Sequence, residues 1–422
     1  MHLQTEEVNM ATKRSPKTRV QASVLLGALK DVLEIIEARN TIPVLSHVLI
    51  EVEDQQLTVM ASDLDQWATR NCATADRDGP DSREWLTSLQ AFSVCLPAKK
   101  LAAVLTELDS EAMVRIEVPS AWSKEWSGQA TVSAGAARFK LNALPVTEFP
   151  APPPIDLDGF FELPCSQLGD VLAAVKHAIS TEETRYYLNG VFMHPVDLDL
   201  RFATTDGHRL ARLRMDGPVG STSYPAVIVA RKTVAVLEKL LAHADKAAKG
   251  SEGEPPVVLI ECNATGSRLQ FTMPTEGDGE VTLIAKTIDG EFPDYGRVIP
   301  SDPKERVTVA RSSLAAVVKR VAVMAEGETR IVKFAFDEDR LTVSARSIDV
   351  GEASEDLACE YRGPAFELGF NSKYLLAALG AIASDVVALR CDGDGASAVR
   401  IAGWEDEDEV GALLQVLMPA RV

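Results

Sequence analysis

The chain lacks most of the features by which a membrane protein or a common enzyme is recognised in a sequence. No apolar run approaches the ~20 residues that a membrane-spanning helix needs. The N-terminal residues contain no apolar signal core, so we expect no export. The GxSxG nucleophile motif, the HExxH zinc motif and the glycine-rich phosphate loop are all missing. These absences argue against the usual hydrolases, metalloproteases and nucleotide-binding enzymes.

Cysteine and histidine are scarce and scattered. The six cysteines form no CxxC pair, which makes both a disulfide framework and a zinc site poor interpretations. We expect reduced, mostly buried thiols in a cytoplasmic protein. The six histidines show no metal-ligand spacing. The sequence therefore predicts no metal and no cofactor.

Basic residues are outnumbered, 43 Lys and Arg against 62 Asp and Glu, for a net charge of −19. This balance argues at first against nucleic acid, because non-specific binding depends on neutralised phosphates. The six helices expected below nevertheless carry a combined charge of +5, so the acidity lies elsewhere. Two interpretations stay open: the helices share one mildly basic surface, or a few lysines only solvate helix faces.

A long internal repeat is the main positive signal. Stretches beginning at residues 20, 163 and 309 each pass from a strand-like residue through a small polar cap into apolar residues at helical spacing. A second set begins at residues 96, 229 and 370, and it aligns Lys99, Lys232 and Lys373 at the start of a short amphipathic helix. A period of 133 to 146 residues is too long for a solenoid. It predicts three copies of a complete domain with two helices each.

Between the helices, short runs alternate apolar and polar residues and end at Gly, Asp or Asn, which is typical of strands and hairpins. We therefore expect an α+β fold of three repeated domains, each with two helices packed on antiparallel sheet. Proline-rich or polar segments at 149–159 and 294–306 are the expected linkers, and 245–256 resembles a solvent loop. The predicted divisions are a disordered extension over 1–18 and domains over 19–150, 159–296 and 303–422. Met10 is a second candidate for the start of the chain.

The densest polar cluster is TTDGHRLAR at 204–212. Asp206 and His208 could form an acid–base pair of a hydrolase. More often, an Asp-Gly-His sequence is a turn whose side chains hold a loop. We expect the turn.

Several strings resemble signature stretches of the bacterial DNA polymerase III β subunit family, the replicative sliding clamps. They include TRYYLNG (184–190), ATTDGHRLA (203–211), DGEFPDY (289–295) and LMPARV (417–422). Others extend the resemblance N-terminally, such as RNTIPVLSHVLIEV (39–52) and FKLNALPVTEFP (139–150). All fall in the family's order and cover residues 18 to 422.

The resemblance implies a ring. Two three-domain subunits would close head to tail as a homodimer, with helices lining a central hole through which duplex DNA passes unread. By the resemblance and the internal repeat, seven residues are expected to face the DNA: Arg39, Lys99, Tyr186, Tyr187, Arg231, Lys232 and Lys373. The alternative for Tyr186 and Tyr187 is that both are core aromatics. Glu182 departs from the family's neutral or basic residue and would weaken contact with DNA at this loop.

The resemblance also implies a pocket between the middle and last domains that captures a short segment of partner proteins containing Gln and Leu or Phe. The matching positions are Leu188, Thr205, Gly207, His208, Arg209, Leu210, Pro293, Arg297, Val298, Val416, Met418, Pro419 and Arg421. Leu188 and Leu210 could instead be plain core residues. Ala420 stands where the family has a long apolar residue, which could enlarge the pocket or shift the choice of partner.

The function expected from the resemblance is a non-catalytic processivity clamp. Its partners would be encircled double-stranded DNA, a second copy of the chain, the replicative DNA polymerase, the clamp loader, repair polymerases and other proteins with a clamp-binding peptide, with no membrane partner. Two alternatives remain at this point. One is a clamp paralogue specialised for a plasmid, a repair pathway or inhibitor resistance. The other is an enzyme built on Asp206 and His208, which would lose turnover rather than partner binding on mutation.

Overall fold

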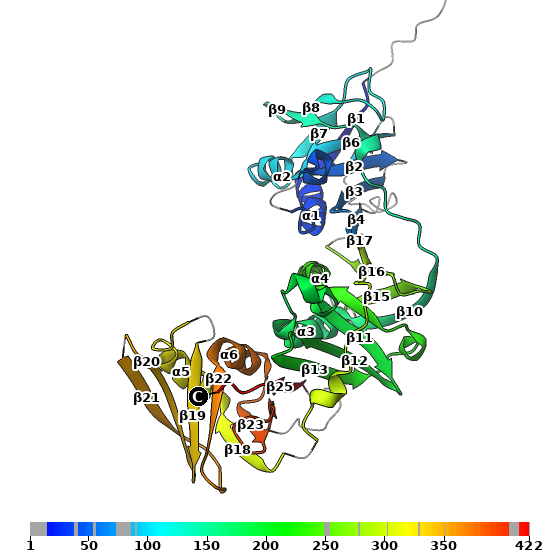
Figure 1. Ribbon diagram of the computed structural model, residues 1–422. Coiled ribbons are helices and arrows are strands. Elements are labelled where there is room, and N and C mark those ends of the chain that lie inside the picture. Colours follow the sequence, from blue (N-terminus) through cyan, green and yellow to red (C-terminus); the bar gives the residue numbers. More distant parts are fainter. Residues whose placement is uncertain are drawn as a thin grey trace, which may run out of the picture. The chain divides into compact units, whose positions relative to one another are not determined.

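The computed structural model describes most of the chain, in two compact units (Figure 1). The described residues are 15–37, 41–53, 56–72, 86–88, 91–248, 254–276, 279–301, 303–327, 330–349, 351–404 and 413–421. The first unit takes its residues from 1–154, 243–254 and 270–285, and the second from 155–242, 255–269 and 286–422. Among the described residues, no helix combines the length and apolar character needed to cross a membrane.

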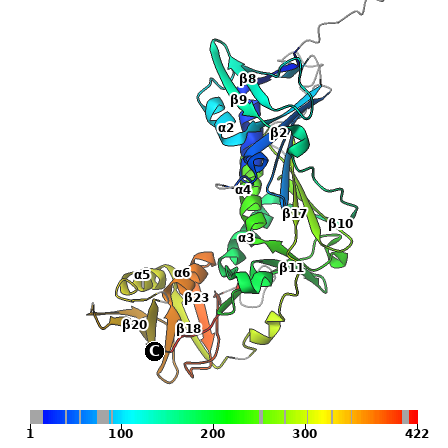
Figure 2. The same cartoon turned by 45° about the horizontal axis from the view of Figure 1, so that its top comes forward.

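The first unit has two helices and two runs of antiparallel strands. Its elements are β1 (Lys17–Gln21), α1 (Ala22–Leu33), η1 (Pro43–Ser46), β2 (His47–Glu53), β3 (Gln56–Ser62), β4 (Gln66–Cys72), β5 (Leu86–Ser88), β6 (Phe92–Pro97), α2 (Ala98–Thr106), β7 (Met113–Glu117), β8 (Gly128–Ala134), β9 (Ala137–Ala143), η2 (Val146–Glu148) and β17 (Glu280–Lys286). The strands pair in the orders β5-β1-β7-β8-β9 and β17-β4-β3-β2-β6. Figure 2 shows the β8–β9 hairpin of the first run clearly.

The second unit repeats this construction twice. Its earlier elements are β10 (Leu157–Pro164), α3 (Cys165–Val175), η3 (Lys176–Ala178), η4 (Glu183–Leu188), β11 (Gly190–Val196), β12 (Asp199–Thr205), β13 (Arg209–Asp216), η5 (Ser221–Ser223), β14 (Val227–Ala230), α4 (Arg231–Ala248), β15 (Val257–Asn263) and β16 (Arg268–Pro274). The end of α4, from His243, and most of β16, from Gln270, belong to the first unit.

The later elements of the second unit are η6 (Tyr295–Val298), β18 (Glu305–Ala310), α5 (Arg311–Val321), β19 (Ile331–Asp337), β20 (Arg340–Ser347), β21 (Gly351–Ala358), β22 (Phe366–Asn371), α6 (Ser372–Ala381), β23 (Val386–Cys391), β24 (Val399–Gly403) and β25 (Leu413–Leu417). An eight-stranded sheet in the order β14-β11-β12-β13-β25-β24-β23-β18 joins the two repeats through the pairing of β13 with β25. A four-stranded sheet, β21-β20-β19-β22, completes the last repeat.

The predicted repeat is confirmed by matching backbone contacts. The first residues of α1, α3 and α5 donate their N–H to the carbonyl oxygen of the residue just before β7, β15 and β23, at 2.9, 2.8 and 2.8 Å. In the same way, Arg231 at the start of α4 and Ser372 at the start of α6 donate to the residues before β11 and β19. Such contacts satisfy helix N-terminal donors that have no partner within the helix. These equivalent contacts support the predicted α+β fold of three like domains.

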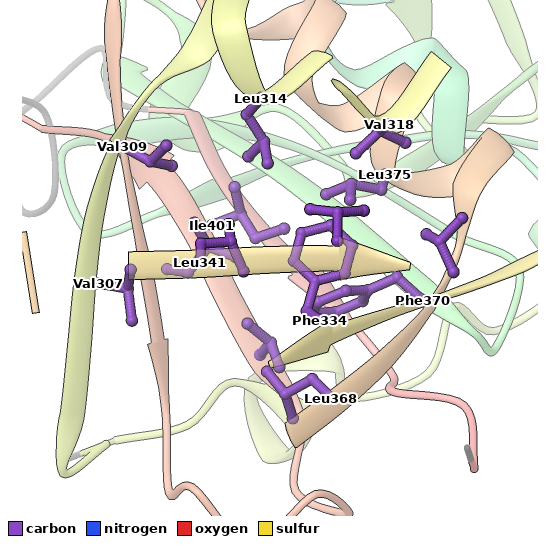
Figure 3. Close-up of a cluster of buried hydrophobic side chains, with 14 of the residues drawn as sticks. Val307, Val309, Leu314, Val318, Phe334, Leu341, Leu368, Phe370, Leu375 and Ile401 are labelled. Atoms are coloured by element: carbon purple, nitrogen blue, oxygen red, sulfur yellow. The ribbon is translucent and has the colours of Figure 1, made fainter. Parts of the chain in front are cut away.

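The last repeat shows how the helices are held. Leu314 and Val318 of α5 and Leu375 of α6 are buried against Phe334, Phe370 and other apolar side chains of the strands (Figure 3). α5 and α6 lie side by side on this core (Figures 1 and 2). The apolar residues at helical spacing therefore mark the buried faces, as the sequence predicted.

Three local expectations were wrong. The residues before α1, α3 and α5 (Gln21, Pro164 and Ala310) make no side-chain capping hydrogen bond; Asn371, before α6, does. The segment 245–256 is not wholly a loop, because α4 continues to Ala248 with Ala244 buried. β1 begins at Lys17, inside the expected disordered extension. The rest of that extension, residues 1–14, lies outside the described residues.

The expected linkers also carry some regular structure. β10 begins at Leu157, within the segment 149–159, and η6 and the start of β18 lie within 294–306. The Asp-Glu-Asp sequence at 337–339 forms a tight hairpin between β19 and β20, since Asp337 pairs with Arg340 and Asp339 has a positive φ of 53°. Residues 54–55, between β2 and β3, lie outside the described residues.

Candidate partner and DNA sites

The C-terminal segment connects the last two repeats and gathers most of the predicted pocket residues. Met418 donates its N–H to the carbonyl oxygen of His208 at 2.9 Å, and Ala420 donates to Gly369 at 2.8 Å. Just before it, Leu210 on β13 lies opposite Val416 on β25. Residues about 200 positions apart in the sequence are therefore neighbours in the sheet.

The pocket residues differ in how much side chain they offer. Leu210 and Val416 are buried in one cluster with Leu414, against which Tyr295 and Ile299 pack. Val298, which lies in the chain between Tyr295 and Ile299, is 51% exposed, and Met418 is 46% exposed. The exposed apolar surface is therefore that of Val298 and Met418, supported by a buried floor.

Leu188 lies in a different cluster. It is 4% exposed and packs with Ala203, Ile228 and Phe292. For this residue the structure agrees with the plain-core alternative, because so little of the side chain is left for a partner. Its place in the pocket wall stays a prediction. Of the remaining members, Pro293, Arg297 and Arg421 are exposed and Pro419 is half-buried.

The loop from Thr205 to Arg209 is held by its own side chains. The Asp206 carboxylate accepts hydrogen bonds from the N–H groups of His208 (2.9 Å) and Arg209 (3.1 Å) and from Arg209 Nε (2.9 Å). The Thr205 hydroxyl donates to the Arg209 carbonyl at 2.6 Å and accepts from Gly207 N–H. Gly207 has a φ of +87°, which an L side chain rarely adopts. The Asp-Gly-His sequence thus forms the expected turn.

Replacing Asp206 by alanine is expected to destabilise this loop by about 2 kcal/mol, since two backbone donors and one guanidinium lose their acceptor. Amide hydrogen exchange at residues 205–209 should increase, and binding of partner peptides should weaken. Asp294→Ala is a matched control, because Asp294 makes the same kind of turn contact, to Gly296 N–H, in an exposed loop. If both variants exchange alike at 205–209, Asp206 does not hold the loop.

Two contacts at this loop were not predicted from the sequence. The Arg209 guanidinium lies over the ring of Tyr374 on α6, 4.2 Å from its centroid, and the His208 ring lies nearly parallel to the same ring at 6.4 Å. A cation over an aromatic face is an attractive contact. Tyr374 therefore positions the loop from the neighbouring repeat. The sequence pattern predicted the helix that contains Tyr374, but it gave this tyrosine no role at the loop.

Glu182, which is expected to weaken contact with DNA at this loop, forms an ion pair with Arg185. Arg185 donates to both of its carboxylate oxygens, at 2.8 and 2.7 Å. These hydrogen bonds lower the pKa of Glu182 and raise that of Arg185. The Arg185 guanidinium also covers Gly207, where a Cβ would lie 2.6 Å from Nη1. The charge of Glu182 is therefore balanced within the loop.

Four of the seven residues expected to face DNA share one position in the fold. Lys99, Arg231, Lys232 and Lys373 are exposed in the first turns of α2, α4 and α6, each just after a strand. Tyr186 is 54% exposed, whereas the half-buried Tyr187 packs on the cluster of Leu188 and Phe292. The core-aromatic alternative is therefore wrong for Tyr186 and partly right for Tyr187. Arg39 lies outside the described residues.

Cysteine chemistry and metal binding gain no support. All six cysteines are buried and unpaired, and burial raises the pKa of the Cys95 thiol to about 12. In the part of the chain that the structure describes, no three His, Cys, Asp or Glu side chains gather as a metal site would require. Burial lowers the pKa of His177 and His194 to about 4, with help from Arg209 and Arg201 respectively.

Three like domains in series, each with basic residues in the first turn of one helix, define the class of sliding clamps. Family models of the DNA polymerase III beta subunit match in series: the N-terminal domain over residues 17–153, the central domain over 162–294 and the C-terminal domain over 296–421. The chain belongs to the DNA polymerase III beta subunit family.

Known sliding clamps are similar to this chain over nearly its whole length. The Beta sliding clamp of Caulobacter vibrioides is 34% identical over 414 residues, covering 96% of this chain and all of that protein. The Beta sliding clamp of Escherichia coli is 28% identical with the same coverage. The crystal structure of a DnaN sliding clamp from Bartonella birtlesii bound to griselimycin has a TM-score of 0.83 at 32% identity, over 97% of this chain and all of that one. The family is a non-catalytic processivity factor of DNA polymerase III.

Proposed function

We propose that two copies of this chain close head to tail around double-stranded DNA and slide on it. The full-length family match carries this proposal, because it places all three domains in the order that a clamp subunit has. The exposed basic residues opening α2, α4 and α6 suit such a lining. Sparse cations on an otherwise acidic chain attract the backbone without the many phosphate contacts that would hold it in place.

The partner site proposed here is the surface around Val298 and Met418. It would bury the apolar anchor of a short segment containing Gln and Leu or Phe, carried by the replicative polymerase, the clamp loader or a repair polymerase. Exposed apolar side chains next to a rigid, buried floor are what such a helix or strand anchor needs. Met418 suits several partners, because an unbranched thioether adapts its shape. Such work would take place in the cytoplasm.

The decisive experiment is retention on circular DNA. The protein is loaded onto nicked circular DNA with a cognate loader and ATP, the circle is then linearised, and release is followed. We expect retention on the circle and rapid loss from free ends. Equal loss from both would exclude a topological link. Complementation of a strain without its normal clamp then separates a replicative clamp from a specialised paralogue, which the relatives named above do not favour.

Neutralising the helix-opening charges gives a second test. Lys99→Gln, Arg231→Gln and Lys373→Gln together are expected to flatten the salt dependence of DNA retention, by about 0.9 in the log–log slope for each phosphate that is no longer neutralised. The control carries the same charge change at exposed positions outside the helices: Lys124, Lys140 and Arg340. Retention half-lives at several salt concentrations provide the readout. Equal slopes in the two variants would remove these three residues from the DNA-facing surface.

A further inference from the structure

Four arginines gather on one face of the sheet that joins the last two repeats. Arg201 on β12 lies opposite Arg214 on β13, Arg212 lies two residues before Arg214, and Arg400 is on β24. Since alternate residues of a strand share a face, Arg212 and Arg214 lie on the same face as Leu210. We call these four residues the arginine cluster. No periodicity in the sequence brings them together, because they come from three strands.

This face of the sheet points away from the helices. Thr204 on β12 donates to the Val175 carbonyl at the end of α3, and Gln415 on β25 donates to the Ala378 carbonyl in α6. Arg201 and Leu414 differ from these residues by an odd number of positions on the same strands, so they lie on the opposite face. The cluster is therefore remote from the helix starts proposed to face DNA.

Positive charge is left over among Arg201, Arg212 and Arg214. Asp199 lies 3.3 Å from Arg201 Nη2 and 3.6 Å from Arg214 Nε. Within the described residues, Asp199 is the one carboxylate that forms an ion pair with Arg201 or Arg214, and Arg212 has none. The buried Nε atoms of Arg201, Arg212 and Arg214 make no hydrogen bond there.

The electrostatics agree with an excess of cations. Burial lowers the pKa of Arg212, and the neighbouring charges of Arg201, Arg214 and Arg400 lower it further. A guanidinium keeps its proton all the same, so an anion that reaches these side chains would be attracted to them. Its planar fork suits a carboxylate, to which it can make two parallel hydrogen bonds.

The cluster continues the proposed partner surface. On β13, Arg212 lies two residues after Leu210, about 7 Å along the strand. It pairs with Leu414 on β25, which belongs to the buried cluster of Leu210, Leu414 and Val416. Arg400 lies opposite Val416, another member. A segment anchored on this floor would carry its next few residues over the cluster.

We propose that the arginine cluster binds a run of Asp or Glu residues flanking the apolar anchor of a partner's clamp-binding segment. This inference rests on the proposed partner site, and it adds a chemical preference: partners with acidic flanks bind more tightly. This patch is locally basic on a chain whose net charge is −19, so its charge is complementary to that of an acidic segment.

The test compares labelled peptides on the full-length protein by fluorescence anisotropy at low and high salt. One peptide carries a Gln- and Leu-Phe-containing anchor with four flanking Gln, and two others carry four Glu before or after the same anchor. We expect one acidic peptide to bind about 3- to 10-fold tighter than the neutral one at low salt, with the gain reduced at high salt. Arg212→Gln with Arg214→Gln should abolish that gain and leave the neutral peptide's affinity unchanged.

Asp199→Asn provides an independent variant that is expected to change the acidic peptide's affinity gain in the opposite direction. It removes the competing carboxylate, so the gain should increase, and this outcome does not depend on whether the arginine variant folds. Equal affinity of acidic and neutral peptides, or a gain that survives loss of both arginines, would overturn the acidic-flank proposal while leaving the partner site intact. If the neutral peptide itself does not bind, the proposed partner site fails and the inference fails with it.

The acidic run at 405–409 of this chain lies outside the described residues and is a competing occupant. A variant with these residues changed to Gln and Asn addresses it. If acidic peptides gain affinity only in that variant, the cluster belongs to the chain's own acidic run and the proposal is overturned. A gain of the same size with and without the run supports a partner's acidic flank. If the protein binds duplex DNA and Arg212→Gln with Arg214→Gln weakens that binding as much as it weakens the acidic peptide's, the acidic-flank proposal is also contradicted.

Discussion

Replacing Val298 and Met418 together by aspartate is expected to weaken binding of a clamp-binding peptide by about a hundredfold or more. About half of each side chain is exposed, 51% and 46%, and this is the surface that a partner's apolar anchor would cover. Losing both side chains removes about 2–3 kcal/mol of apolar burial. Two carboxylates that must be dehydrated on binding add to the loss. Peptide titration by anisotropy or calorimetry measures it.

The fold should tolerate this change, because neither side chain is part of a buried cluster. Val219→Asp with Ile348→Asp is the matched control, since both residues are 98% exposed and the added charge is the same. It should leave peptide affinity unchanged. Leu210 or Val416 would be a poor choice, because each is 2% exposed and a charge there would unfold the floor. A double aspartate variant that binds like the control would place the partner site elsewhere.

The helices and the repeat were predictable because their signals are local. Apolar spacing within ten or so residues fixes which face is buried, and the aligned lysines mark the same first turn in each domain. The sequence placed the helix starts correctly, but the small polar caps used to place them make no capping hydrogen bond in α1, α3 and α5. In α1, α3 and α5 the first N–H donates to a distant backbone carbonyl rather than to a cap side chain, and that carbonyl belongs to the residue just before a strand.

The α4 terminus shows the limit of composition. The sequence DKAAKG predicted the start of a polar loop, but the helix extends to Ala248 because Leu241 and Ala244 continue its buried face. Alanine and lysine favour helix as readily as a solvated loop. The polar character of the segment therefore reflected the exposed side of a helix.

The sequence predicted which residues belong to the candidate site, but not which of their side chains are exposed. The family resemblance supplied Leu188, Leu210 and Val298 alike, yet two are buried and one is exposed. Exposure depends on which strands pair, and the β13–β25 register is set by residues about 200 positions apart. The arginine cluster escaped prediction for the same reason. A net charge of −19 says nothing about where cations gather.

Replacing Arg70 by methionine is expected to destabilise the first unit by about 3–5 kcal/mol, because it leaves Asp31 buried without its counter-ion. Arg70 Nε lies 3.2 Å from Asp31 Oδ2, with side chains only 7% and 11% exposed. The same guanidinium donates to the carbonyl oxygens of Asn71 and Glu276, both at 2.8 Å. It therefore holds β4 to α1 and to the chain before β17. Urea unfolding and amide exchange in β3 and β4 measure the loss.

The effect should depend on pH. Burial raises the pKa of Asp31 even with Arg70 and His243 opposing it. The folded state therefore holds this proton more tightly than the unfolded state, so the group's contribution to stability is largest at low pH and falls as pH rises through the folded pKa. Without Arg70 the pKa of Asp31 rises further. The variant's deficit should thus be larger at pH 8 than at pH 5.

A double variant separates the buried charge from the missing hydrogen bonds to the carbonyl oxygens. Arg70→Met with Asp31→Leu removes both ions, and replacing a buried pair by apolar side chains is often neutral. We expect it to recover most of the stability that Arg70→Met loses and to lose the pH dependence. If it is no more stable than the single variant, the backbone carbonyls left without a donor carry the cost. Arg138→Met, at an exposed position on β9, is the control and should stay within about 0.5 kcal/mol of the parent.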